Sequence, residues 1–546
     1  MIPVVWFFRV LVLTGRINFS PGLIIVVGIT IGLFGIQCHA KIPQDVLIMA
    51  TQIDDMITLD PAEIFEFSAA EYAANVYDRL VTFEPDDFST VAGGVAESWV
   101  ISRNGREFRF RIRPGLKFHS GNPVTAQDAA YSLQRVVRLN LSPAFILTQF
   151  GLNGANVHER VRAESEDILI IETDKSYAPT FVLNCLSAGV GSVVDQSVVQ
   201  SYEVDGDMGH RWLRTNSAGS GPFMLSRWKA NESIVLKRHT EYWREVPAMS
   251  RVILRHIGEP ATQRLLLQKA DVDIARDLGP DQIAGLASVP NVVVRPVPKS
   301  GIYYLGLNQR SDILRRPRVV EALKHLVDYQ GLRDSLLANR ASIHQSIVPK
   351  GFVGAIQDQP YVLDVEKART LLAQAGYGNG FRLNIDTRNT SPAMEIAQSL
   401  QATFALAGIE INIVPGDGKQ VLTKYRARNH EIFLGRWGTD YQDPHSNASA
   451  FAYNPDNSES SVTKSLAWRN GWPHPELSEM VGRAVREKDG ARRAALYREM
   501  QRIHMRVSPF VIMFQDIEIV ALRKNVHGFI SGPTFDTVFY RNVTKD

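Results

Sequence analysis

The sequence has little cysteine, with only Cys38 and Cys185 among 546 residues. If the N-terminal segment that contains Cys38 is removed, Cys185 stands alone and no internal disulfide can form. Cys185 has apolar neighbours, which predicts a small buried residue rather than a nucleophile. The sequence also lacks an excess of one charge, because 60 Lys and Arg balance 57 Asp and Glu to a net charge of +3. This balance argues against a nucleic-acid-binding protein with a basic patch.

Three sequence motifs that carry enzymatic chemistry are also missing. There is no Gly-x-x-x-x-Gly-Lys-Ser/Thr phosphate loop, no His-Glu-x-x-His metal site and no Gly-x-Ser-x-Gly nucleophile elbow. The 13 histidines are scattered without metal-ligand spacing. We therefore expect no catalysis, no metal and no cofactor. A secreted hydrolase with paired carboxylates stays open as a remote alternative, because any chain of this size contains many acidic residues.

The first 40 residues differ in composition from the rest. Residues 1–40 contain two arginines but no acidic residue, and residues 23–36 form an apolar run that small residues follow. This order predicts a secretory signal peptide over residues 1–40. The run of 14 residues is short for a membrane span, although a retained anchor is the alternative. Lipidation of Cys38 is a further alternative, which Gln37 in front of it fits poorly.

After residue 40 the pattern is that of an α/β protein with mixed sheets. Apolar and basic residues alternate over residues 108–113, which predicts a half-buried strand. Thr125 and Asp364 are suited to begin helices, and Gly376 to end the second one. The other predicted elements are strands at 234–237, 251–257 and 510–514, a helix that Pro317 begins, and helices at 476–488 and 490–506.

The most informative stretch is the run from Trp437 to Pro444. Within eight residues it contains an aromatic ring, the acidic side chain of Asp440 and a proline. Such a loop can hold an ammonium group between a carboxylate and an aromatic wall, where reduced solvation strengthens the charge interaction. Asp and Pro are also ordinary turn residues, so the stretch gains its meaning from the segments around it.

The segments around this run resemble those of one protein family, and they occur in the same order as in that family over about residues 45–540. Residues 96–99 and 108–132 resemble the signature of the peptide-binding proteins of bacterial ABC importers, solute-binding protein family 5. Further family-like segments are Leu59–Pro61, Gly219–Phe223, Tyr242-Trp243, Asp271–Ile274, Tyr304–Asn308, Asp364–Tyr377 and Trp437–Pro444.

The resemblance implies a two-lobed periplasmic binding protein fold of type II, similar to cluster C, with mixed sheets, a hinge and an extra sub-domain. Lobes of this kind close on a ligand, and the closure reports occupancy to a membrane partner. The implied ranges are 41–82, 196–300 and 508–546 for the first lobe, 83–195 for its extra sub-domain and 301–507 for the second lobe.

The resemblance also implies how a ligand is held. Asp440, in a Trp-x-x-Asp motif, corresponds to the residue that takes the ligand's α-ammonium group, and Trp437 to a wall of the pocket. Arg388 is the candidate for the ligand carboxylate, since a guanidinium can bind it through two hydrogen bonds. The alternatives are a turn-forming Asp440, a core-packing Trp437 and a solvated Arg388.

Other residues are weaker candidates. Phe65, Phe67 and Tyr441 are expected either to line the pocket or to pack in the core. Arg436 stands where the family usually has an uncharged residue, and Asn447 follows the motif; both favour a more polar or anionic ligand if they face it.

The expected function is the periplasmic substrate-binding component of an ABC importer. It would act as a monomer that captures a short peptide or another amine-bearing solute and delivers it to a permease served by a separate ATPase chain. Relatives in the family also bind opines, oligosaccharides, nickel chelates and haem, so the fold does not fix the ligand. A signalling or chaperone role, with docking on a receptor, is a further alternative.

Overall fold

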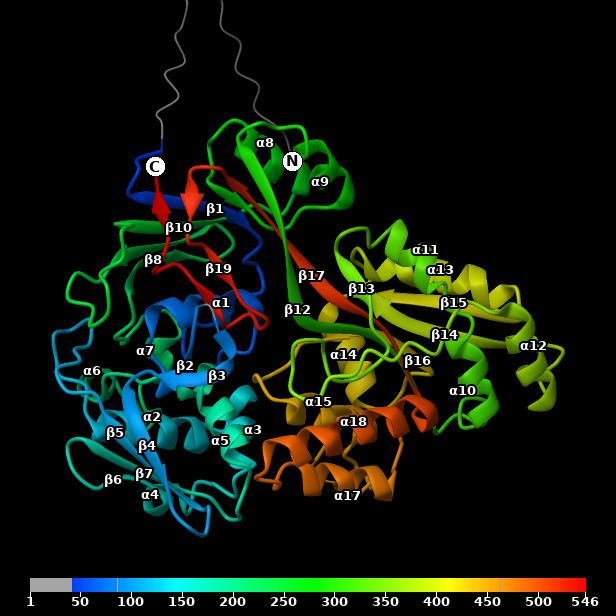
Figure 1. Cartoon of the computed structure of the whole chain (residues 1–546), viewed down its shortest axis with the longest axis horizontal. Helices are drawn as coiled ribbons and strands as arrows, with labels where there is room; N and C mark the ends of the chain where they lie inside the picture. Colours follow the sequence, from blue (N-terminus) through cyan, green and yellow to red (C-terminus); the bar gives the residue numbers. More distant parts are fainter. Residues whose placement is uncertain (1–41, 86, 462) are drawn as a thin grey trace, which may run out of the picture. The chain divides into compact units, whose positions relative to one another are not determined.

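The computed structural model describes residues 42–85, 87–461 and 463–546, so the predicted signal peptide lies outside the described residues. The described chain is a mixed α/β structure, as the sequence predicts (Figure 1). One large sheet has the strand order β15-β14-β16-β12-β17-β11-β1-β10-β9-β8, with β13 paired to β17 beside this path. Its strands are β1 (Val46–Thr51), β8 (Phe223–Lys229), β9 (Ser233–Arg238), β10 (Arg251–His256), β11 (Ile274–Ala275), β12 (Val292–Leu307), β13 (Ala341–Ile343), β14 (Phe381–Arg388), β15 (Ile409–Gly416), β16 (Ile432–Trp437) and β17 (Phe510–Arg523).

The first lobe is built on strands β11, β1, β10, β9 and β8. Because β1 pairs in parallel with both β10 and β11, it is a central strand that needs cover on its faces. Leu47 and Met49 of β1 share one hydrophobic cluster with Tyr72 and Val76 of helix α1. The other elements of this lobe are α1 (Phe67–Val76), α6 (Gln196–Ser201), α7 (His210–Leu213), α8 (Pro260–Gln268), α9 (Pro280–Leu286), β18 (Val526–His527), β19 (Ile530–Ser531), β20 (Val538–Phe539) and β21 (Thr544–Lys545).

A separate antiparallel sheet of order β4-β5-β7-β6 carries the extra sub-domain. The predicted strand is β5, in which alternate residues are buried. Thr125 caps α2 as predicted, in a capping box with Asp128. Cys185 is fully buried on α5, which confirms its expected core role. The elements are β2 (Val81–Glu84), β3 (Asp87–Gly93), β4 (Ala96–Ile101), β5 (Glu107–Ile112), α2 (Ala126–Leu139), η1 (Ser142–Ala144), α3 (Phe145–Thr148), α4 (Val157–Arg160), β6 (Val161–Ala163), β7 (Ile168–Glu172), α5 (Pro179–Leu186) and η2 (Gly189–Gly191).

The second lobe is built on β12, β16, β14 and β15 with helices around them. Asp364 caps α12 by accepting a hydrogen bond from the backbone N–H of Lys367, as predicted. Gly376 lies just after this helix at φ +88°, a conformation that favours glycine. The helices are α10 (Pro317–Lys324), α11 (Tyr329–Asp334), α12 (Val365–Gln374), α13 (Ala393–Ala405), α14 (Gly418–Arg426), α15 (Pro444–Ala452), α16 (Leu466–Arg469), α17 (Pro475–Ala484) and α18 (Gly490–Val507).

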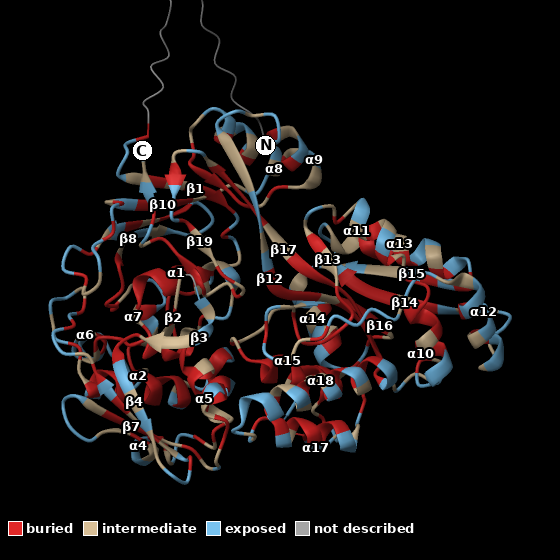
Figure 2. Cartoon of the chain, in the orientation of Figure 1, coloured by how far each residue is buried: buried red, intermediate tan, exposed pale blue. Residues whose placement is uncertain are grey.

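Two long strands, β12 and β17, connect the lobes. They pair antiparallel from Val292 opposite Arg523 to Gly306 opposite Phe510, with irregular register between Pro298 and Ile302. Most of β17 is buried, which Figure 2 shows as a long red stretch. The predicted strand at 510–514 is therefore the first third of a 14-residue element. Sequence periodicity missed its length because a strand that is buried on both faces shows no alternation.

A buried charge network lies beside these strands. Glu518 of β17 accepts a hydrogen bond from Arg276 Nε at 2.6 Å and lies 3.1 Å from the ammonium group of Lys299 on β12. Arg276 also pairs with Glu71 of α1. Burial alone would raise the pKa of Glu518, but Arg276 and Lys299 outweigh it and hold this pKa well below its usual range. The network fixes β12, β17 and α1 to one another on the first-lobe side.

The predicted lobe boundaries stay a proposal, and the structure places two of them at or within the long strands. The boundary at 300/301 falls inside β12. Residues 510–514 of β17 belong to the hydrophobic clusters of the second lobe, although the boundary at 507/508 assigns them to the first. The predicted helix at 476–488 ends earlier, at Ala484, where the next carbonyl, of Val485, accepts a hydrogen bond from the backbone of Ala178 instead.

Candidate ligand-binding cleft

A cleft of about 1530 Å³ is lined by residues of both lobes and the extra sub-domain. This volume exceeds the usual 300–1,000 Å³ of small-molecule pockets. Five of the six predicted site residues line it, and Tyr441 does not. Its charged lining residues are Glu66, Lys175, Arg388, Arg426, Arg436, Asp440, Lys464, Arg469, Glu479, Arg486 and Asp536.

Asp440 lies in the loop between β16 and α15. Its backbone N–H donates to Ser446 Oγ at 3.0 Å, and the Ser446 hydroxyl donates to Asp440 Oδ2 at 3.3 Å. Burial raises the pKa of Asp440 to about 7, although Ser446 and the charge of Arg469 act in the opposite direction. Within the described residues its only hydrogen-bonding partner is a serine, so the carboxylate lacks a direct cationic contact in the cleft. A ligand ammonium group would supply one.

Trp437 ends β16 and combines the two roles that the sequence left open. The ring lines the cleft and also packs edge-to-face on Phe451, with centroids 6.1 Å apart. Its indole N–H donates to Asn447 Oδ1 at 3.3 Å. Asn447 is buried and donates to the carbonyl of Ile347 at 2.6 Å, so it orients Trp437 and does not itself face the cleft.

Tyr441 is only 2 % exposed and packs in the core of the extra sub-domain, its ring centroid 6.0 Å from that of Phe181. The sequence left two roles open for Tyr441, pocket lining and core packing, and the structure shows core packing. The next acidic residue, Asp443, caps α15 and pairs through both carboxylate oxygens with Arg493 of α18, at 2.7 and 2.8 Å. The sequence gives no signal for this ion pair, because its partners are 50 residues apart.

Arg388 is the last residue of β14 and lies exposed at the cleft. The nearby Asp386 is buried and accepts a hydrogen bond from Lys424 at 2.6 Å. The Asp386 carboxylate is therefore paired with Lys424 and not with Arg388. Arg436 also lines the cleft, but it pairs with Asp516 of β17. The unusual arginine before Trp437 is thus partly neutralised, whereas Arg388 is available to an anionic group. Its role as a carboxylate ligand stays a prediction.

The first-lobe side of the cleft presents aromatic rings. Phe65, Phe67 and Phe145 are 44 %, 38 % and 42 % exposed. Phe67 stacks on Phe535 with centroids 3.7 Å apart, and the Arg436 guanidinium lies 5.0 Å from the Phe67 centroid. Exposed aromatic rings in a concave surface favour an apolar part of a ligand. No local signal in the sequence connects Phe145 with Phe65, because the two residues belong to different sub-domains and meet only in the folded chain.

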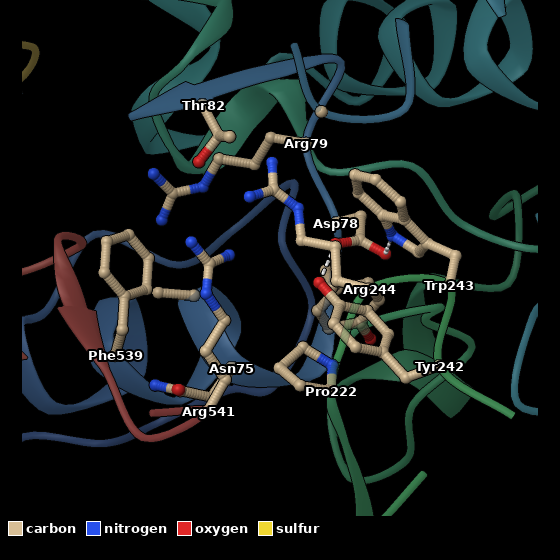
Figure 3. Close-up of a pocket in the computed structure, with 13 residues that line it drawn as sticks. Asn75, Asp78, Arg79, Thr82, Pro222, Tyr242, Trp243, Arg244, Phe539 and Arg541 are labelled. Carbon is tan, nitrogen blue, oxygen red and sulfur yellow. Dashed lines mark hydrogen bonds between the residues drawn. The ribbon is translucent and has the colours of Figure 1, made fainter. Parts of the chain in front are cut away.

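A second, very small pocket of about 20 Å³ lies between α1, β2 and the Tyr242-Trp243 pair (Figure 3). Asp78 accepts hydrogen bonds there from the Tyr242 hydroxyl at 3.0 Å and the Trp243 indole at 3.1 Å. Burial raises the pKa of Asp78. The pocket has room for about one water molecule, so it is a structural site and not a substrate site.

Metal clusters and membrane-spanning helices are both absent from the described ranges. No group of His, Cys, Asp and Glu there is arranged to hold a metal ion. No helix within the same ranges has the length and apolar character needed to cross a membrane.

The pKa of Asp440 leads to a first prediction. Because this pKa is about 7 in the free protein, the carboxylate becomes protonated below pH 7 and loses the charge that attracts an ammonium group. The affinity for an amine-bearing ligand should therefore fall toward tenfold per pH unit below about pH 7. Isothermal titration calorimetry between about pH 5 and pH 8 measures this change, and Asp440→Asn should abolish it. A dissociation constant that stays constant over this range would contradict the prediction.

Two lobes joined by paired strands, with a large cleft lined from both, define a solute-binding protein of the periplasmic type. The sequence matches the model for bacterial extracellular solute-binding proteins, family 5, middle region, over residues 90–459, and the chain belongs to this family.

Individual relatives are more distant. The chain is 26% identical over 514 residues to the probable D,D-dipeptide-binding periplasmic protein DdpA of Escherichia coli K12, covering 92% of this chain and 95% of the relative. It is 24% identical over 532 residues to heme-binding protein A of Haemophilus influenzae, and the match covers 92% of this chain and 91% of the relative. The solved structure of the periplasmic binding protein DppA of Helicobacter pylori in complex with the peptide STSA is similar at a TM-score of 0.78, with 23% identity and coverage of 92% and 98%.

Proposed function

We propose that the protein is the periplasmic substrate-binding component of an ABC importer and captures short peptides, dipeptides or oligopeptides. In this proposal the lobes close on the ligand and present it to a membrane permease that is driven by a separate ATPase chain. The observation that carries the proposal is Asp440, a carboxylate in the cleft with a raised pKa and a serine as its hydrogen-bonding partner. A buried carboxylate is costly until a cation pairs with it, and the ligand's α-ammonium group is such a cation.

Several further features support this proposal. The names of the relatives that bind a D,D-dipeptide or the peptide STSA point to peptides as the ligand class. The predicted signal peptide supports export to the periplasm, where the protein would act as a monomer without a cofactor or catalytic activity. Arg388 would bind the carboxylate of a short ligand, while Trp437, Phe65 and Phe67 would enclose its side chains.

A larger non-peptide solute is the second candidate. The volume of about 1530 Å³ and the exposed aromatic side of the cleft suit a ligand bigger than a dipeptide. Heme-binding protein A is among the relatives. This second candidate function also includes the binding of opines, oligosaccharides or metal chelates.

A thermal-shift screen of the mature protein tests the proposal. The panel contains dipeptides, longer peptides, opines, oligosaccharides, metal chelates and haem. A ligand that binds only the folded state raises the melting temperature with the ratio of its concentration to its dissociation constant. We expect shifts with peptides that have a free amino end. Shifts only with members of the other classes would contradict peptide binding, and release of a cleaved product from any ligand would contradict a purely binding role.

A further inference from the structure

The edge of the large sheet in the first lobe carries basic side chains on one face. The edge strands β8, β9 and β10 pair in sequence and continue into β1 (Figure 1). Their register aligns alternate residues, which share a face, in rows across the four strands. The rows are Val46, Arg251, Lys237 and Met224, then Ile48, Ile253, Val235 and Arg227, then Ala50, Arg255, Ser233 and Lys229. We call the surface formed by the five cations of these rows the basic face.

The opposite face of the same strands is the core side. Leu236, Val252 and Leu254 are buried and share a hydrophobic cluster with Leu47 of β1. Since alternate residues of a strand point to opposite faces, the five cations point away from this core. Four of them are exposed, and Arg255 is half-buried. The basic face is therefore open to a partner.

Acidic residues do little to neutralise the basic face. In the part of the chain that the structure describes, its one ion pair joins Lys229 to Glu232 in the turn between β8 and β9. Arg251 and Lys237 are directly opposite each other across β10 and β9, and like charges in this position are unfavourable. None of the three rows contains an Asp or Glu. The face is thus locally positive although the whole chain is close to neutral.

Apolar side chains lie between the cations. Ile253 and Val235 are opposite each other in the middle row, and Met224 ends the first row; all three are half-buried. Cations around partly exposed apolar groups are suited to the surface of an anionic lipid bilayer. There the headgroup charges attract the cations, and the apolar groups meet the boundary of the acyl chains.

The start of the described chain lies next to the basic face. The carbonyl of Asp45 accepts hydrogen bonds from the backbone N–H groups of Ser250, at 2.7 Å, and of Arg251. In the sequence, only residues 37–41 separate Ile42 from the apolar run at 23–36. Even a fully extended segment of this length spans only about 20 Å. Whenever the apolar run is in a membrane, the edge of the basic face at Arg251 is therefore tethered close to the lipid headgroups.

We propose that the basic face binds anionic phospholipid headgroups and so keeps the protein at the surface of the membrane. The inference goes beyond the proposed function, because it does not depend on the ligand in the cleft. Each cation near an anionic bilayer strengthens binding by about fivefold, and salt weakens the attraction. The contact is therefore reversible and leaves the protein close to a permease in the same membrane.

Vesicle sedimentation of the mature protein tests the proposal, because Ile42–Asp546 form a compact unit without the apolar run. The vesicles contain phosphatidylcholine alone or with about 30% phosphatidylglycerol. We expect wild type to bind the anionic vesicles about tenfold or more tightly, and this preference should disappear in about 0.5 M salt. Lys237→Gln combined with Arg251→Gln should weaken binding to the anionic vesicles by about tenfold or more. Lys237→Arg combined with Arg251→Lys should retain it, because the attraction depends on charge.

Arg316→Gln combined with Arg318→Gln is the matched control. Both arginines are exposed at the start of α10 in the second lobe, and the double substitution removes the same charge. This variant should bind vesicles like wild type, and all variants should keep the melting temperature of wild type. An equal loss in both glutamine variants would indicate attraction by net charge alone and would overturn the proposal. Wild type that does not distinguish the two vesicles would also overturn it and leave an acidic protein surface as the partner. Neither result affects ligand binding in the cleft, which the thermal-shift screen measures separately.

Discussion

Replacing Arg493 with glutamine should lower the free energy of unfolding by about 3–5 kcal/mol, the range for breaking a buried ion pair. Arg493 binds both carboxylate oxygens of Asp443 and donates to Thr180 Oγ1 of α5 at 3.2 Å. Both partners of the pair are almost completely buried. The variant would leave the Asp443 carboxylate buried without its counter-charge and would weaken the contact between α5 and α18.

The neighbouring Arg492 provides a matched control. It lies on the same helix but is 71 % exposed and pairs with Glu487 at the surface. Arg492→Gln should change the free energy of unfolding by less than about 1 kcal/mol, as is usual for a surface ion pair. Urea unfolding of the two variants beside wild type measures both values. Equal effects of the two substitutions would show that the Asp443 pair contributes no more than a surface pair.

Replacing Asp440 with asparagine should have two opposite effects. Affinity for an amine-bearing ligand should fall by about 1.5–3 kcal/mol, the contribution of a hydrogen bond to a charged group. The ligand-free protein should at the same time become more stable at neutral and higher pH. The carboxylate that binds the ligand's ammonium group destabilises the ligand-free protein, because burial disfavours its charged form.

The sign of the stability effect follows from proton linkage. The pKa of Asp440 is about 7 in the folded protein and near 3.8 in an exposed Asp, so between these values the folded state binds the proton more strongly. The stability of wild type therefore decreases as the pH rises through this window and stays lower above it. The asparagine side chain of the Asp440→Asn variant does not titrate. Because Asp440 is partly open to the cleft, the variant should gain only about 1–3 kcal/mol above pH 7 and little near pH 4.

Unfolding curves of both proteins at several pH values, without ligand, measure this gain. Asp312→Asn is the control, since Asp312 is an exposed aspartate that pairs with Arg315 far along the chain from the loop. It should alter neither ligand affinity nor the pH dependence of stability. A variant Asp440→Asn that binds ligand like wild type would remove Asp440 from the site.

Local sequence signals predicted the parts of the fold that local forces determine. Thr125 and Asp364 are helix caps because their side chains accept backbone hydrogen bonds three residues ahead, and such bonds need no tertiary context. The length of β17 was not predictable, because both of its faces are buried and its residues do not alternate. The carbonyl of Val485, just after the early end of α17, accepts a hydrogen bond from Ala178, some 300 residues away, and no local pattern indicates this contact.

The site was predictable only where one segment holds several of its residues. The Trp437–Pro444 run placed Trp437 and Asp440 in the cleft, but it did not show that Tyr441 turns into the core. Arg426 ends α14 and Arg469 ends α16, and no spacing in the sequence indicates that both line the cleft.

The central claim is that Asp440 binds the amino end of a peptide ligand, and one calorimetric measurement tests it most directly. A peptide that binds in the screen is titrated with its amino end free and with it acetylated, into wild type and Asp440→Asn. Acetylation should weaken binding to wild type by about tenfold or more but change binding to the variant little, because the variant has already lost the partner of the amino end. Equal losses in the two proteins, or no loss in wild type, would contradict it.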